Sequence, residues 1–140
     1  MLTIERVIHA ARNHVWDFLG DLEAWAGMLP TVDEIERVDG VGPIAVGSRF
    51  RVRQPGLAEA TYEITEWQPG RAFTWQAPLR GVRTVATHHL RDHDSGSELT
   101  LGIAWHGPLA GPVRLTFRRK TLRFLDAEAA TLARLAEARP

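Results

Sequence analysis

The chain has 140 residues, of which 17 are lysine or arginine and 17 are aspartate or glutamate, so its formal net charge is zero. With 44% hydrophobic and 24% charged residues it has the composition of a single globular domain, residues 1–140, that can bury a sizeable core. The balanced charge supplies no positive field for nucleic acid or acidic lipid. The absence of cysteine excludes disulfides, thiolate catalysis and cysteine-ligated metal sites.

Neither a signal peptide nor a membrane span is expected. Residues 1–11 include Glu5, Arg6 and His9, which interrupt the continuous apolar region that a secretory signal requires. No later stretch provides the roughly 20 apolar residues that a membrane-spanning helix needs. We therefore expect a cytoplasmic protein. Lys120 is the one lysine among the basic residues and alanine is abundant, a bias of GC-rich coding that favours a bacterial source.

The N-terminal part of the chain predicts a strand followed by helix. Residues 3–9 are rich in β-branched side chains and predict a strand. Asn13 is placed to cap a helix over residues 14–25, where apolar side chains recur at steps of three and four. The pair at residues 20–21 leaves open whether this stretch is one helix or two short ones.

The middle of the chain predicts an antiparallel meander. Apolar and polar residues alternate with a period of two in four stretches, residues 50–52, 62–64, 73–75 and 99–105. Turn-forming residues separate the strands, at residues 54–56, 68–70, 78–81 and 92–97. These intervals are too short for helical crossovers, so a parallel sheet is disfavoured.

The C-terminal part predicts one long helix. Pro112 suits the first helical position, because its missing N–H group is not needed there, and the helix should run to about Ala138. One face of this helix is apolar and the other is charged, so the apolar face is expected to pack on the sheet. The order of elements predicts an α+β fold.

Two glycine patterns do not form nucleotide sites. Residues 40–45 match G-x-G-x-x-A, but Pro43 and the strand-like residues that follow replace the helix that a dinucleotide site requires. Residues 42–47 have the glycine spacing of a P-loop, but Ser48 and Arg49 stand where the phosphate-binding lysine and the magnesium-binding hydroxyl are needed. We therefore expect no cofactor.

Metal and nucleic-acid sites are not expected either. His88 and His89 are neighbours in a predicted strand and point to opposite faces, and His93 is predicted to lie in a turn. The arginines of the last helix fall mainly on its solvent-facing arc together with acidic residues, which favours a solvated surface over an RNA site.

Large aromatic side chains occupy the inward positions of the predicted strands. These are Phe50, Tyr62, Phe73, Trp75 and Trp105. They either fill the core or line a pocket between the sheet and the helix. Trp16 is expected in the core, whereas Trp25 and Trp67 either cap the core or cover the mouth of a pocket.

Polar groups on the same apolar faces are more informative, because burying one without a partner costs roughly 1 to 3 kcal/mol. Besides Tyr62, these are His88, Arg118 and Glu128. His88 is either a neutral imidazole bonded within the protein or a group that orients a ligand or transfers a proton. Arg118 either contacts a ligand or extends to the edge of the sheet. Arg118 and Glu128 are roughly 15 Å apart along the helix, so each needs another partner.

Four segments give the chain a resemblance to the START-related SRPBCC superfamily, and within it to the polyketide cyclase/dehydratase-like group. They are AARNHVWDFLGDLEAW (residues 10–25), GPIAVGSRF (42–50), EWQPGR (66–71) and GSELTL (96–101). The resemblance implies a helix-grip (START/Bet v 1-like) fold. In this fold a curved antiparallel sheet of about six or seven strands wraps around a long C-terminal helix, with one or two short helices after the first strand and a hydrophobic cavity between sheet and helix. The matched residues build core and turns, so no catalytic residue is carried across.

The leading hypothesis is binding of a small hydrophobic, aromatic or polycyclic molecule in that cavity. The expected apolar wall consists of Phe50, Tyr62, Phe73, Trp75, Ile103 and Trp105, with His88 and Arg118 orienting a carbonyl or carboxylate. One alternative is a cyclase, aromatase or dehydratase-like enzyme with His88, Tyr62 and Arg118 as candidate catalytic groups. The other is a protein-interaction or stress-response module without a ligand. Whether the chain forms a homodimer is left open.

Overall fold

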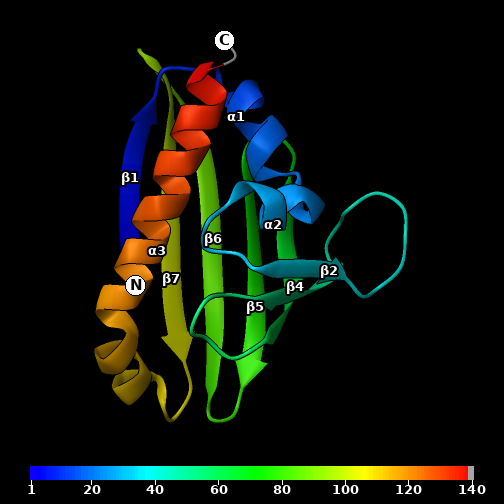
Figure 1. Cartoon of the computed structure of the whole chain (residues 1–140), viewed down its shortest axis with the longest axis vertical. Coiled ribbons are helices and arrows are strands. Elements are labelled where there is room, and N and C mark those ends of the chain that lie inside the picture. The colour runs from blue at the N-terminus through cyan, green and yellow to red at the C-terminus, as the bar shows by residue number, and fades with distance from the viewer. Residues whose placement is uncertain (139–140) are drawn as a thin grey trace.

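The computed structural model describes residues 1–138, which form one curved antiparallel sheet with a long helix across one face (Figure 1). The seven strands are β1 (Leu2–Ile8), β2 (Glu34–Arg37), β3 (Arg49–Arg53), β4 (Ala60–Gln68), β5 (Ala72–Leu79), β6 (Val82–His93) and β7 (Gly96–His106). The helices are α1 (Arg12–Leu19), the 3-10 turn η1 (Leu22–Ala24), α2 (Trp25–Met28) and α3 (Ala110–Ala138). The predicted α+β helix-grip architecture is confirmed.

The sheet is a meander that is completed by the first strand. Its order is β1-β7-β6-β5-β4-β3-β2, so β2 to β7 pair as successive hairpins and β1 adds to the far edge beside β7. Leu2 pairs with Ile103 and Ile8 with Ser97, which fixes the register of that edge. The segment from α1 to α2 then leads the chain from β1 to the opposite edge, and α1 lies beside the C-terminal part of α3 (Figure 1).

Several boundaries differ from the sequence predictions. Asn13 does not cap a helix, because α1 begins at Arg12 with the extended residue Ala11 before it. The alternative of two short helices is correct, since α1 ends before residues 20–21. His93 is the last residue of β6 and not part of a turn, because the hairpin to β7 needs only residues 94–95 between paired His93 and Gly96. The alternation of apolar and polar residues does not predict strand β2, because Ile35 is its one apolar residue.

The core lies where α1, η1 and α2 cover the sheet. Phe73 is fully buried there and is surrounded by the rings of Trp16, Trp25 and Trp67, with centroid distances of 6.2, 6.0 and 5.5 Å. The C-terminal half of α3 belongs to the same core. Its buried residues are Leu125, Glu128, Ala129, Thr131, Leu132, Ala133 and Ala136. No residue of α3 before Leu125 is buried, so the N-terminal half of the helix stands farther from the core.

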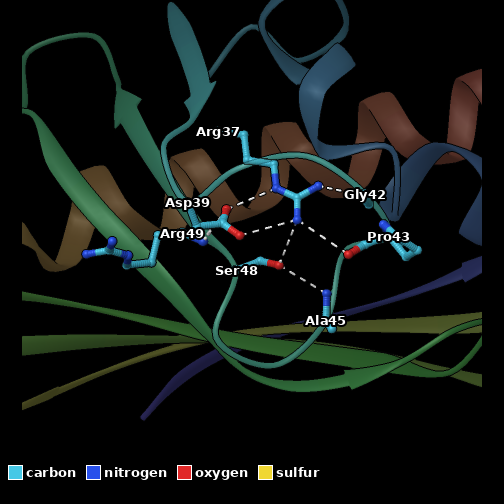
Figure 2. Close-up of polar contacts among 7 residues, drawn as sticks. All are labelled: Arg37, Asp39, Gly42, Pro43, Ala45, Ser48 and Arg49. Carbon is cyan, nitrogen blue, oxygen red and sulfur yellow. Dashed lines mark hydrogen bonds and ion pairs between the residues drawn. The ribbon is translucent and has the colours of Figure 1, made fainter.

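The loop between β2 and β3 is organised around Arg37 (Figure 2). The Arg37 guanidinium donates to the Asp39 carboxylate (3.0 and 3.3 Å), the carbonyls of Gly42 (2.5 Å) and Pro43 (3.4 Å), and Ser48 Oγ (3.3 Å). The bond from Arg37, together with a second from the backbone N–H of Arg49, lowers the pKa of Asp39 to about 2. The glycine pattern of this segment therefore folds as a loop around an arginine and does not precede a helix.

Candidate ligand-binding cavity

A cavity of about 230 Å³ lies between the sheet and the N-terminal half of α3. Strands β3 to β7 contribute, among others, Val52, Ala60, Tyr62, Trp75, Ala77, Thr84, Ala86, His88, Ile103 and Trp105. Helix α3 contributes Val113, Phe117, Thr121, Phe124, Leu125 and Glu128. Trp25, Val32 and the loop between β3 and β4 also take part. The volume lies slightly below the roughly 300 to 1,000 Å³ of sites for drug-sized ligands, so it suits a small molecule.

The cavity exists because the side chains on its two sides do not meet. On the sheet, the inward positions of β4, β5 and β6 carry small residues, Ala60, Ala77 and Ala86. In the C-terminal half of α3, small side chains such as Ala129 and Ala133 bring the helix close to the sheet and are buried. In the N-terminal half the rings of Phe117 and Phe124 are only half-buried, although they face the cavity. The small side chains on the sheet and the partly exposed N-terminal half of α3 leave this space open.

Five of the eight residues predicted to contact the ligand line this cavity. They are Tyr62, Trp75, His88, Ile103 and Trp105. Phe50 and Phe73 do not, since both rings are fully buried in the core. Arg118 is exposed and is not a lining residue. The cavity-facing positions of α3 run from Phe117 through Thr121 and Phe124 to Glu128, and Arg118 is turned about 100° from Phe117.

Glu128 is the polar cavity residue that the sequence reasoning left out of the site. Its carboxylate oxygen Oε1 accepts a hydrogen bond of 2.9 Å from Thr31 Oγ1, 97 residues away in the chain. The sequence does contain a signal that Glu128 is buried, because this residue falls at the border of the apolar arc of the last helix and needs a partner. That Thr31 supplies the partner depends on the course of the loop after α2, which local patterns do not determine.

His88 is held as a neutral imidazole. Its Nδ1 lies 3.1 Å from the carbonyl oxygen of Phe73, and its ring stacks on the Phe73 ring at 3.9 Å. A carbonyl oxygen only accepts, so this contact assigns the proton to Nδ1 and leaves Nε2 as an acceptor. Burial lowers the pKa of His88 to about 3. His88 therefore offers a ligand an acceptor and carries no positive charge at neutral pH.

Burial raises the pKa of two further ionisable groups that line the cavity. It raises the pKa of the Glu128 carboxyl to about 7, against the opposing effect of the hydrogen bond from Thr31. It also raises the pKa of the Tyr62 phenol to about 12, with a further contribution from the negative charge of Glu128. Near neutral pH the cavity thus holds a carboxyl group that exchanges its proton readily and a phenol that remains a hydrogen-bond donor.

The family model described as polyketide cyclase/dehydrase and lipid transport matches residues 1–137. The chain belongs to this family. The resemblance inferred from its four sequence segments is confirmed. No curated protein sequence matches the chain.

Solved structures share the fold of this polyketide cyclase/dehydrase-family chain at low sequence identity. A hypothetical protein, jhp0584, from Helicobacter pylori has a TM-score of 0.81 at 14% identity, covering 96% of this chain and 86% of the other. Ara h 8.0201 has a TM-score of 0.64 at 15% identity, covering 94% and 95%. The di-domain ARO/CYC StfQ from the steffimycin biosynthetic pathway has a TM-score of 0.72 at 16% identity, covering 98% of this chain and 49% of StfQ.

Other site types find no support in residues 1–138. No group of three or more histidine and acidic side chains in this part of the chain is arranged to hold a metal ion. None of its helices is both long and apolar enough to cross a membrane. The cavity between the sheet and α3 is lined by three ionisable groups, Tyr62, His88 and Glu128.

Proposed function

We propose that this protein binds a small aromatic molecule in the cavity between the sheet and α3. The observation that supports it is an apolar space whose wall carries three large aromatic side chains, Tyr62 on β4, Trp75 on the adjacent β5, and Trp105 on β7. Tyr62 and Trp75 are stacked with ring centroids 4.9 Å apart, so each ring holds the other in place, and a planar ligand gains contact area against the parts of the stack that reach the cavity. A long lipid chain would exceed the volume.

Filling the cavity tests this proposal. Ala86 is an inward residue of β6 at the cavity wall, and Ala86→Leu adds apolar volume into open space. We expect the variant to retain the wild-type melting temperature and to lose affinity for a neutral probe, 1-naphthalenemethanol, by about a hundredfold, because the ring and the new side chain compete for one space. Titration calorimetry measures both proteins.

The matched control is Ala104→Leu on β7. Ala104 lies between the lining residues Ile103 and Trp105, so its side chain points to the other face of the sheet. This variant should bind the probe like the wild type. Equal affinity of Ala86→Leu and the wild type would refute binding in the cavity, as would the absence of any binding by the wild type.

A second candidate function, proton transfer at a carbonyl compound, is favoured by the near-neutral pKa of Glu128. The carboxylate would take a proton from the carbon beside a ligand carbonyl. The electron pair of the broken C–H bond would be delocalised onto the carbonyl oxygen, which gives an enolate. The Tyr62 hydroxyl would donate a hydrogen bond to the enolate oxygen. Return of the proton from Glu128 to the carbon would restore the carbonyl compound and the carboxylate. His88, the base suggested by sequence, is a weak one because its pKa is about 3.

Exchange of carbon-bound hydrogen distinguishes this enzyme from a binding protein. With 1-acetonaphthone in D₂O at neutral pH, an enzyme should accelerate deuterium uptake into the methyl group, as followed by proton NMR. Glu128→Gln should then reduce the acceleration by about a hundredfold or more. Uptake at the rate of buffer alone would reject the enzyme and leave the binding proposal to the Ala86→Leu experiment.

A further inference from the structure

The charges around the cavity are one-sided. The ionisable residues that line it are Tyr62, His88 and Glu128, and no lysine or arginine within residues 1–138 is among the lining residues. Lys120 belongs to the same part of α3, but its amino group lies over the Phe124 ring at 5.7 Å and it does not line the cavity. A bound carboxylate or phosphate would therefore find no cation there to offset its loss of water.

Glu128 and His88 offer hydrogen-bond acceptors to a ligand that donates, beside the Tyr62 hydroxyl, which is itself a donor. Oε1 of Glu128 already accepts from Thr31, and the second carboxylate oxygen, Oε2, is a further acceptor. Nε2 of His88 is an acceptor because Nδ1 carries the proton toward the Phe73 carbonyl. His88 is neutral and Arg118 is exposed and outside the lining, so neither of these predicted ligand contacts supplies a positive charge within the cavity.

The aromatic wall supports the same choice of ligand. Trp25, Tyr62 and Trp75 line the cavity, and the Trp75 ring contacts both of the others, with centroid distances of 5.4 Å to Trp25 and 4.9 Å to Tyr62. The face of an aromatic ring carries partial negative charge, so it attracts an organic cation that has left water. An aromatic wall next to a buried carboxylate is complementary to a cation with an apolar body.

Resting on the proposed binding function, we propose that the ligand is a hydrophobic amine whose protonated amino group pairs with the Glu128 carboxylate while its apolar body lies against Tyr62, Trp75 and Trp105. The four groups line one cavity and come from α3, β4, β5 and β7. The sequence places them far apart, and the fold brings them together.

The pairing makes binding depend on pH. The ammonium ion pairs with the ionised form of Glu128, whose pKa is about 7 in the free protein. Below that pH the protein must release a proton on binding, so the affinity falls by about tenfold for each pH unit. Above it, the affinity is constant until the amine loses its own proton. Tyr62 and His88, which line the cavity with Glu128, do not titrate between pH 6 and pH 8, since their pKa values are about 12 and about 3.

Three probes with one ring system test the inference. They are 1-naphthylmethylamine, 1-naphthalenemethanol and 1-naphthoic acid, titrated into the wild type at pH 6 and pH 8 by calorimetry. We expect the amine to bind at pH 8 about tenfold more tightly than the alcohol, and the acid to bind most weakly. At pH 6 the advantage of the amine should fall by about tenfold, while the affinity for the alcohol stays constant.

Variants assign the effect to one side chain. Glu128→Gln should reduce the affinity for the amine to that for the alcohol and abolish its pH dependence, whereas Glu5→Gln, an exposed residue of β1, should change neither. If all three probes bind equally, or the acid binds best, the inference is wrong while the cavity remains a binding site. If no probe binds the wild type, the proposed binding function itself fails.

Discussion

Replacing Glu128 by glutamine should stabilise the fold by about 3 kcal/mol at pH 8 and leave it almost unchanged at pH 4. The folded protein raises the pKa of this carboxyl from 4.5 to about 7, so it holds the proton more tightly than the unfolded chain does. The stability of the wild type therefore decreases as the pH rises from 4.5 and reaches its lower limit above 7. Glutamine imitates the protonated carboxyl and still accepts the hydrogen bond from Thr31.

His88 contributes a slope of the opposite sign. The fold lowers the pKa of its imidazole from 6.5 to about 3, so the unfolded chain binds the proton more tightly. Its contribution to stability rises as the pH increases from 3 to 6.5 and is constant above that. In the wild type the two slopes oppose each other between pH 4.5 and pH 6.5. In Glu128→Gln only the rise due to His88 remains.

Urea unfolding at pH 4, 6 and 8 measures these differences, with Glu5→Gln as the control for loss of an exposed carboxylate. The free energy of unfolding of the control should follow that of the wild type at each pH. Parallel curves for Glu128→Gln and the wild type would contradict the assignment, and so would a variant that is less stable at pH 8. A buried carboxyl that lowers stability at neutral pH is the kind of group that proteins keep for binding or catalysis.

The fold could be predicted because its signals are local. The period of two along the strands, the Pro-Gly turn at residues 69–70 and the long apolar face of the last helix each depend on neighbours in sequence. The errors arose where a local signal was weak or had a competitor. Asn13 is a good capping residue, but the chain enters α1 one residue before it. Turn-forming side chains at residues 92–97 concealed how far β6 and β7 extend.

The site was only partly predictable, because alternation identifies which side chains point inward and not what covers them. Phe73 and Trp75 occupy equivalent inward positions two residues apart on β5. The short helices α1 and α2 enclose Phe73 completely, whereas Trp75 reaches the cavity. Which part of the sheet α3 approaches closely depends on Ala129, Ala133 and Ala136 in its C-terminal half, a property of packing between distant segments.

This division between core and cavity predicts opposite results for two aromatic residues. Phe73→Ala should lower the free energy of unfolding by about 3 to 5 kcal/mol, because it leaves a space between three tryptophan rings and uncovers one face of His88. Trp105→Ala should lower it by only about 1 kcal/mol, since this half-buried ring borders the cavity. Urea unfolding measures both.

Ligand affinity should show the reverse order. Trp105→Ala removes a surface that a bound ring contacts and should weaken binding of 1-naphthalenemethanol by about tenfold. Phe73 does not line the cavity, although its ring contacts the lining residues His88 and Trp75, so its substitution should weaken binding by the folded protein by only about twofold to threefold. If Phe73→Ala does not fold, Phe73→Leu keeps the comparison, with a smaller loss of stability and no larger a change in affinity. A loss of affinity in the Phe73 variants, with none in Trp105→Ala, would show that the ligand lies at the core end of the sheet and not beneath the N-terminal half of α3.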